Sequence, residues 1–207
     1  MSEPTPVLRV QDLHFGWPGR PLFQGLNLDL PPGVSLVTGD DGGGKSTLLR
    51  LIAGELTAQG GQLSLAGLRP DLQLQAWRQQ VFWIDPHTNA HDAVRAGDYL
   101  ASLPAQYPGF SAEAVAELVE GFALEAHLAK PLYMLSAGSR RKVWLTAAFA
   151  AGTPLTLIDQ PFAALDGPAM RFLRELLQDV AGHPRRAWLI ADHEAPAGVP
   201  LASTVRL

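Results

Sequence analysis

The chain has 207 residues, 47% of them hydrophobic and 17% charged, and a formal net charge of −4. This length suits one α/β domain with a buried core, and no second full domain fits. The negative charge argues against general nucleic-acid binding, and the absence of cysteine excludes a disulfide framework and a thiol-ligated metal. In chain order, the polar and proline-rich residues 1–6 are the segment in which we expect disorder.

The first third of the chain predicts short strands and then a helix. Apolar residues gather at 7–15, 22–30 and 34–38, separated by the turn signals WPGRP and PPG. We expect antiparallel strands that lead into one buried strand at 34–38. A glycine-rich loop follows at 39–47, and residues 46–53 then place leucine and isoleucine at helical spacing. Strand, glycine loop and helix form the context that a phosphate-binding loop requires.

The rest of the chain alternates strands with helices. Residues 87–135 are expected to be mostly helical, with Ser111 as the N-cap of one helix. Alternating elements predict an α/β fold with a mainly parallel sheet, and the phosphate-binding loop between strand and helix indicates a P-loop NTPase core. An N-terminal antiparallel β subdomain and a small helical subdomain complete the expected fold. Further strands are expected at 61–66, 81–84, 155–158 and 187–191, and helices at 111–122, 138–151 and 168–180.

The longest uncharged stretch, residues 143–158, is broken by Gly152, Thr153 and Pro154. It is therefore expected to form a buried helix and a buried strand rather than a membrane span. The chain also opens without the pattern of a signal segment. Any work at a membrane is expected to need a partner chain.

The sequence GDDGGGKST at 39–47 fits the pattern G-x-x-x-x-G-K-[ST]. Its glycines let backbone N–H groups close around phosphate, and the following helix adds the positive end of its dipole. Lys45 is expected at the β- and γ-phosphates and Ser46 at Mg²⁺. The alternative is a glycine-rich turn with a solvated lysine. The candidate phosphate-binding residues are Gly39, Gly42, Gly43, Gly44, Lys45, Ser46 and Thr47.

Two acidic residues, Asp40 and Asp41, stand inside this loop. Carboxylates near a polyphosphate weaken its binding unless they point away or meet cationic partners.

An apolar strand at 155–159 ends in Asp159, as in sites that hold Mg²⁺ beside a nucleotide. Taken alone, Asp159 would better suit a helix-capping aspartate after a core strand, but the glycine loop upstream favours the metal role. The next residue, Gln160, carries an amide that is isosteric with glutamate and cannot act as a base.

Three more motifs follow in order: LSAGS at 135–139, ALD at 164–166, and His193 after the strand at 187–191. With GDDGGGKST and LTLIDQP they resemble the ATP-binding subunit of an ABC transporter, from about residue 7 to about residue 195. The run RRKVWLTAAFAAGTPLTLIDQPFAALD also looks similar to haem-exporter-type subunits of cytochrome c maturation.

The resemblance implies contacts to ATP. Ser136 and the backbone of Gly138 would meet the γ-phosphate bound to a second subunit, and Asp166 lies in the loop that crosses to that subunit. His193 matches a histidine that touches γ-phosphate, and Trp17 an aromatic that stacks on adenine. Without the resemblance, Ser136 or Ser139 is a helix N-cap, Trp17 packs in the core or a turn, and His193 has no chemical role.

The chain departs from the family pattern at several positions. Gln160 stands where the family has the glutamate that acts on the attacking water, which predicts slow hydrolysis with ATP binding retained. Ala137 and Ser139 replace glycine and glutamine, which would weaken contacts to the second subunit. Asp41 occupies a place near the family's dimer interface.

Another departure is Pro86, which stands where the family has a glutamine that senses Mg²⁺ and the membrane partner. Asp85 and His87 are the candidate replacements, and Asp85 is also a candidate for the carboxylate that Gln160 lacks.

The sequence therefore predicts one ABC-type ATP-binding domain over 1–207, with 87–135 as its helical subdomain. It would form a homodimer or heterodimer around Mg-ATP and act, in the cytoplasm at the inner face of a membrane, on a separate transmembrane permease subunit. Alternatives are a fully active ATPase that uses another base or carries an engineered Glu-to-Gln change, and a non-transport ABC module in assembly or regulation. A small-molecule kinase is a further alternative, against which LSAGS and ALD argue.

Overall fold

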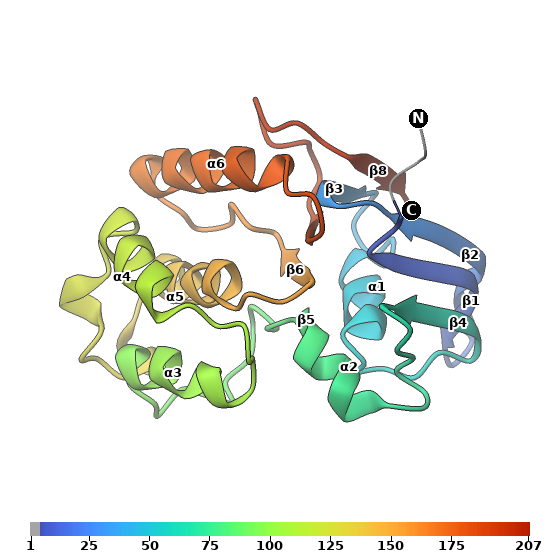
Figure 1. Cartoon of the computed structure of the whole chain (residues 1–207), viewed down its shortest axis with the longest axis horizontal. Helices are drawn as coiled ribbons and strands as arrows, with labels where there is room; N and C mark the ends of the chain where they lie inside the picture. The colour runs from blue at the N-terminus through green and yellow to red at the C-terminus, as the bar shows by residue number, and fades with distance from the viewer. Residues whose placement is uncertain (1–4) are drawn as a thin grey trace.

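The structure is a computed structural model that describes residues 5–207. The expected disorder at residues 1–6 therefore lies largely outside the described residues. An antiparallel sheet lies on one side of a parallel sheet, and most helices lie on the other side (Figure 1). This arrangement agrees with the predicted α/β class.

The antiparallel sheet forms from the apolar runs near the amino terminus. It consists of β1 (Leu8–Trp17), β2 (Arg20–Leu30) and β4 (Gly60–Leu65), in the order β2-β1-β4. Both neighbouring pairs are antiparallel, so the predicted strands are confirmed here. The short turn between β1 and β2 leaves Trp17 and Arg20 opposite each other in the register.

The parallel sheet has the order β5-β6-β7-β3-β8, and all of its neighbouring strands are parallel. Its strands are β3 (Gly33–Thr38), β5 (Val81–Phe82), β6 (Leu155–Asp159), β7 (Ala187–Ala191) and β8 (Ser203–Arg206). Every residue of β6 and β7 is buried, as expected for central strands that are covered on both faces.

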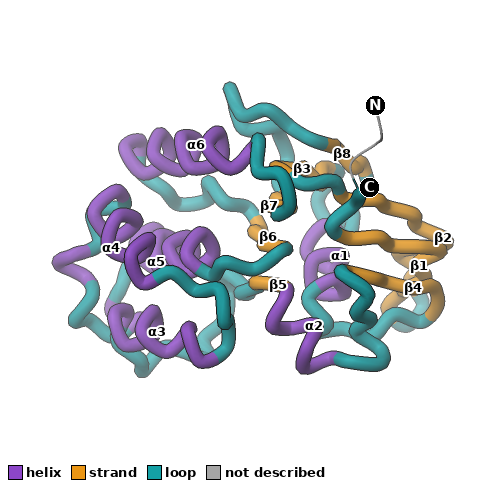
Figure 2. Tube along the Cα trace, in the orientation of Figure 1, coloured by secondary structure: helices purple, strands orange, loops and turns teal. Residues whose placement is uncertain are grey.

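The helices divide between the two faces of the parallel sheet (Figure 2). One hydrophobic cluster joins α1 and the antiparallel sheet to Val37, Leu157 and Leu189 of the parallel sheet. A second cluster packs the helices α3, α4, α5 and α6 against the opposite face of the parallel sheet, where Leu36 and Ile190 lie. The helices are α1 (Lys45–Ile52), α2 (Leu74–Gln80), α3 (Ala96–Ser102), α4 (Ala112–Gly121), α5 (Ala137–Ala150) and α6 (Gly167–Ala181).

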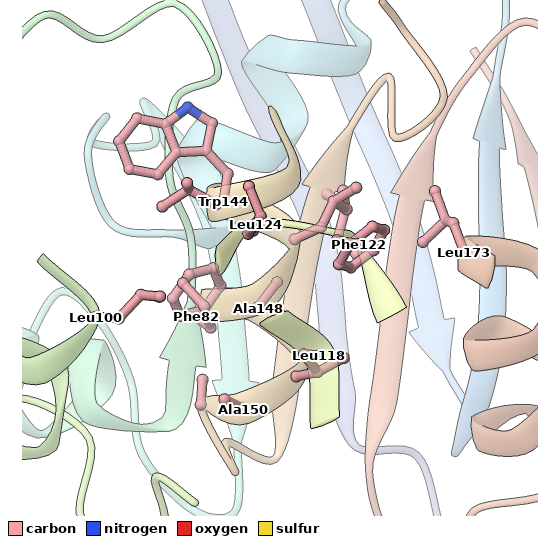
Figure 3. Packing of buried hydrophobic residues seen from close by; sticks show 14 of the residues in the cluster. Phe82, Leu100, Leu118, Phe122, Leu124, Trp144, Ala148, Ala150 and Leu173 are labelled. Carbon is pink, nitrogen blue, oxygen red and sulfur yellow. The ribbon is translucent and has the colours of Figure 1, made fainter. Parts of the chain in front are cut away.

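Helix α5 is buried around most of its circumference, because it lies between β6 and the helices α3 and α4. Figure 3 shows Trp144 and Ala148 of this helix packed among Phe82, Leu118 and Leu124. The predicted N-cap of α4 is present, since Ser111 Oγ accepts a hydrogen bond from Ala114 N at 3.1 Å. No helix within residues 5–207 has the length and apolar character to cross a membrane.

Candidate functional site

The carboxyl ends of three adjacent parallel strands bring the sequence motifs together. In the register, Ala191 at the end of β7 pairs with Val37 of β3 on one side and with Asp159 of β6 on the other. The residues that follow these strands therefore lie along one edge of the sheet, where parallel α/β sheets bind their ligands. They include the loop 39–47, Gln160 and His193.

The loop 39–47 has the form of a cradle that would suit phosphate, and its last three residues begin α1. Gly44 has a φ of 104°, in the left-handed region, which a residue with a side chain adopts only with strain. Gly44 is also the N-cap of α1, and no side chain in the described part of the chain caps this helix. The first N–H groups of α1 are therefore free to bind an anion.

Lys45 is folded over its own loop. Its Nζ donates to the carbonyl oxygens of Gly39 at 2.7 Å and Asp40 at 3.1 Å, and the residue is 7% exposed. These bonds hold a buried positive charge in the centre of the cradle, where a polyphosphate would sit.

A cavity of about 330 Å³, called the phosphate cavity below, opens in front of this cradle. Trp17 borders it and is 43% exposed, and its ring forms an edge-to-face pair with Phe15 at a centroid distance of 5.2 Å. The exposure agrees with a stacking surface for a base better than with a core residue. The lining also includes Asp41, Gly42, Gly43, Ser46 and Thr47.

Arg20 is a member of the site that sequence reasoning missed. It lines the same cavity, and its Nη2 donates to the Gly42 carbonyl oxygen at 3.1 Å. Its place across the β1–β2 turn from Trp17 was the available signal. It supplies part of the positive charge that the acidic residues of the loop require.

Asp159 is buried at the end of β6, and its Oδ1 has no hydrogen-bond partner within the described residues. Burial raises the pKa of this carboxyl, while the Ser46 hydroxyl and the charge of Arg141 oppose the rise. Arg141 Nη1 also donates to the Asp159 carbonyl oxygen at 2.6 Å. An unpartnered carboxylate oxygen near a hydroxyl fits Mg²⁺, which prefers oxygen ligands.

This pair is a partial ligand set. No group of three or more His, Cys, Asp or Glu residues within 5–207 is arranged to hold a metal ion. The residues thus fit a Mg²⁺ ion that takes its other ligands from phosphates and water.

Gln160 lies between two cavities. It borders the phosphate cavity and a second one, of about 480 Å³, that is also lined by Pro86, His87 and Ala137. Its N–H donates to the Ala191 carbonyl oxygen at 2.8 Å, and its φ of 46° lies in the left-handed region.

The segment 85–87 lies near the carboxylate of Asp159. Burial is the largest cause of the raised pKa of Asp159, and Ser46 and Arg141 oppose it. This segment makes two smaller contributions: the charge of His87 lowers the pKa of Asp159, and the charge of Asp85 raises it. Asp85 Oδ1 also accepts a hydrogen bond from His87 N at 2.8 Å. Both candidate replacements for the missing glutamine therefore act electrostatically on the site.

His193 reaches the phosphate loop of its own chain. Its Nε2 lies 3.4 Å from Asp41 Oδ1. Its backbone is held on both sides, because Thr38 Oγ1 donates to the His193 carbonyl oxygen at 2.9 Å and His193 N donates to Asp192 Oδ1 at 2.8 Å.

Ser136, Gly138 and Asp166 lie at the starts of α5 and α6 and do not line the phosphate cavity, and neither do Gly39, Asp159 and His193. Ser136 Oγ accepts from Ser139 N at 3.1 Å and caps α5, which is the simpler of the two roles expected for it. A Cβ at Gly138 would overlap the carbonyl oxygen of Ala164, so only glycine allows this close approach. Asp166 Oδ1 caps α6 by accepting from Ala169 N at 2.8 Å.

Residues 23–163 match the sequence model of a protein family described as ABC transporter. The chain belongs to the ABC transporter family. It is 31% identical over 204 residues to a cytochrome c biogenesis ATP-binding export protein of Pseudomonas syringae pv. syringae, covering 96% of this chain and 95% of the relative. It is also 31% identical over 205 residues to a taurine import ATP-binding protein of Escherichia coli K12, covering 97% and 79%.

Solved structures support the same assignment. The fold is similar to the ATP-binding subunit of an ABC transporter, with a TM-score of 0.79, 25% identity, and coverage of 89% of this chain and 79% of the other. A putative ABC transporter ATP-binding protein from Pyrococcus furiosus has the same fold, with a TM-score of 0.77, 19% identity, and coverage of 97% and 96%. These findings confirm the predicted fold class and the ABC transporter ATP-binding domain, and they argue against a small-molecule kinase.

Proposed function

We propose that this ABC ATP-binding domain binds Mg-ATP in the loop 39–47, dimerises around two such nucleotides, and hydrolyses them slowly. The observation that carries the proposal is the place of Gln160 on the wall of the phosphate cavity. An amide there can orient a water molecule by hydrogen bonding, but it cannot accept the proton of that water.

The nucleotide is recognised at its two ends. Lys45, the free N–H groups of α1 and Arg20 supply positive charge for the phosphates, and Trp17 supplies an exposed aromatic face for the base. Gly39, Gly42, Gly43, Gly44 and Thr47 complete the loop as backbone and hydroxyl donors.

Ser46 and Asp159 would hold the Mg²⁺ ion, which neutralises charge on the phosphate oxygens and polarises the terminal phosphate. His193 would donate to the terminal phosphate. In the absence of a base at Gln160, the expected loss of rate is about 10²- to 10⁴-fold, while ATP binding is retained.

The dimer completes the site. The N-terminus of α5, which begins beside Ser136 and Gly138, would face the terminal phosphate of a nucleotide bound to a second subunit, as the family resemblance implies. Asp166 would lie in the loop that crosses to that subunit. The second subunit would be a copy of this chain or a related one. We assign 1–207 as a single domain, in which 87–135 is the helical subdomain.

A second candidate function is a faster ATPase that uses Asp85 as its base. The effect of Asp85 on the pKa of Asp159, small beside that of burial, favours this alternative, because it places a second carboxylate near the site. An engineered change at Gln160 would give the same sequence. Restoring glutamate should raise the rate whether Gln160 is natural or engineered, and should leave it unchanged if Asp85 is the base. Loss of nucleotide-dependent Mg²⁺ affinity in Asp85→Ala would support the Asp85 alternative, and no change would exclude it.

The domain would work in the cytoplasm, at the inner face of a membrane, through a separate permease subunit. Relatives with export and import names match equally well, at 31% identity, so these matches favour neither direction of transport. The haem-exporter-type resemblance makes a membrane protein of cytochrome c maturation the first partner to test.

The experiment measures Mg-ATP binding by calorimetry and ATP-dependent dimerisation by light scattering, with Lys45→Ala as the control. We expect binding and dimers for the wild type and neither for the variant. Copurification with a polytopic membrane protein would exclude a non-transport module. Equal behaviour of wild type and variant would contradict the proposed site.

A further inference from the structure

Asp41 and His193 contact each other at the mouth of the phosphate loop. Asp41 Oδ1 lies 3.4 Å from His193 Nε2, and the two side chains are 93% and 49% exposed. One residue belongs to the loop that would hold the phosphates, and the other follows the central strand β7. A contact between these positions joins the phosphate loop to the adjacent edge of the sheet.

The backbones on both sides of this contact are fixed. His193 is held through its carbonyl oxygen by Thr38 Oγ1 and through its N–H by Asp192 Oδ1. On the loop side, the residue after Asp41 accepts a hydrogen bond from Arg20 Nη2 at 3.1 Å. The imidazole and the carboxylate therefore meet because both backbones are held in place, although both side chains are exposed.

A polyphosphate in the loop would compete with this contact. Its inner phosphates would rest on the N–H groups of the loop and of α1, and Lys45 stands at the centre of the cradle. The terminal phosphate would then extend toward the carboxyl ends of β6 and β7, where Asp159 ends β6 and His193 follows two residues after the end of β7. The single Nε2 of His193 cannot point at both the Asp41 carboxylate and that phosphate.

We propose that Asp41 competes with the terminal phosphate of ATP for His193 and thereby lowers the preference of the loop for ATP over ADP. The inference rests on the proposed binding of ATP in this loop. With ADP bound, His193 keeps its contact with Asp41. With ATP bound, the contact must open, and its loss offsets part of the gain from the terminal phosphate.

The chain supplies a matched control in Asp40. It carries the same charge one residue earlier, and its carboxylate takes part in no ion pair within the described part of the chain. Removing the Asp40 charge therefore changes the general field at the phosphates, whereas removing the Asp41 charge also releases His193.

The experiment measures the dissociation constants of Mg-ADP and of a non-hydrolysable Mg-ATP analogue by calorimetry at low salt, where surface charges are least screened. The proteins are the wild type, Asp41→Asn, Asp40→Asn, His193→Ala and the Asp41→Asn/His193→Ala double variant. We expect Asp41→Asn to raise the preference for the ATP analogue over ADP about two- to fivefold, the range of an exposed ion pair. Asp40→Asn should change this preference less than Asp41→Asn does, because it alters only the general field at the phosphates.

The double variant separates competition for His193 from simple repulsion. In the His193→Ala background, Asp41→Asn should change the ATP/ADP preference only about as much as Asp40→Asn does, because the field effect remains and the competition for His193 is gone. The inference is overturned if Asp41→Asn does not alter the preference for the ATP analogue over ADP. It is also overturned if Asp41→Asn alters that preference equally with and without His193. If the wild type binds neither nucleotide, the proposed function fails and the inference fails with it; if it binds ATP with no change of preference in Asp41→Asn, only the inference fails.

Discussion

Lys142 Nζ lies 2.7 Å from Asp166 Oδ2 and so joins helix α5 to the N-terminus of α6. Asp166 uses its other oxygen, Oδ1, to cap α6. One carboxylate thus connects the helix that begins at the LSAGS motif to the ALD loop. The geometry of the segments proposed to face a second subunit depends on this residue.

Replacing Asp166 should separate the two roles of its side chain. Asp166→Ala loses both the cap and the ion pair, and a lost cap costs about 0.5–2 kcal/mol of stability. Asp166→Asn keeps a capping side chain and loses only the partly exposed ion pair, which contributes about 1 kcal/mol or less. Urea unfolding at neutral pH should therefore rank the wild type first, Asn next and Ala last. Equal losses for both variants would contradict the capping role.

Acid should reduce the advantage of the wild type over Asp166→Ala. The hydrogen bond from Lys142 and then the bond from Ala169 N lower the pKa of Asp166 in the folded chain. The stabilisation is therefore complete above the unfolded-state pKa and is lost as the pH falls through the lower folded-state pKa. The same unfolding experiment at decreasing pH measures this convergence.

Gly138→Ala should destabilise the chain, although alanine favours helices. The added Cβ would overlap the Ala164 carbonyl oxygen, and relieving an overlap of this kind costs about 1–3 kcal/mol. Gly167, in the first turn of α6, is the control, because the nearest atom to its added Cβ is Arg171 Nη1 at 3.7 Å. Gly167→Ala should be neutral or stabilising by up to about 1 kcal/mol in thermal melting. A tolerated Gly138→Ala would show that the ALD loop can move away.

Asp159→Asn should raise the stability of the nucleotide-free chain and abolish the Mg²⁺ dependence of ATP binding. Burial raises the pKa of Asp159, so the folded state disfavours the ionised carboxylate at neutral pH. This unfavourable contribution is complete above the raised folded-state pKa and disappears as the pH falls below the unfolded-state value. The melting temperature of the variant should thus exceed that of the wild type at neutral pH and converge with it in acid. A less stable variant would contradict this sign.

Trp17→Ala should weaken ATP binding by roughly 1–3 kcal/mol, the usual contribution of stacking between an aromatic side chain and a base. Trp17→Phe should retain most of the affinity, since it keeps an aromatic face at the cavity. Tripolyphosphate, which has no base, should bind the wild type and Trp17→Ala equally in the same calorimetric assay. If Trp17→Ala weakens the binding of ATP and of tripolyphosphate equally, Trp17 stabilises the loop 39–47 and does not stack on the base.

Much of the fold could be predicted because it depends on apolar runs bounded by turns. The strands β1, β2, β3 and β7 lie within one or two residues of their predicted ranges. Strand β5 is shorter than predicted, because pairing with β6 involves only Val81 and Phe82 before the chain turns toward Pro86.

Two elements could not be predicted because their own residues give little signal. Helix α2 buries only Trp77, and no side chain within the described chain caps its start. Strand β8 is partly exposed and is fixed by its pairing with β3, far away in the sequence. In the site, the motifs gave Lys45 and Asp159, whereas the contacts of Arg20 with the loop and of Asp41 with His193 depend on tertiary structure.

The most direct test of the account compares steady-state Mg-ATP hydrolysis by the wild type and by Gln160→Glu, with ATP-dependent dimerisation confirmed for both. The account predicts that the glutamate variant hydrolyses ATP about 10²-fold faster or more, because it restores a base on the wall of the phosphate cavity. Equal rates for two proteins that both dimerise would show that another residue serves as the base, and would contradict the central claim.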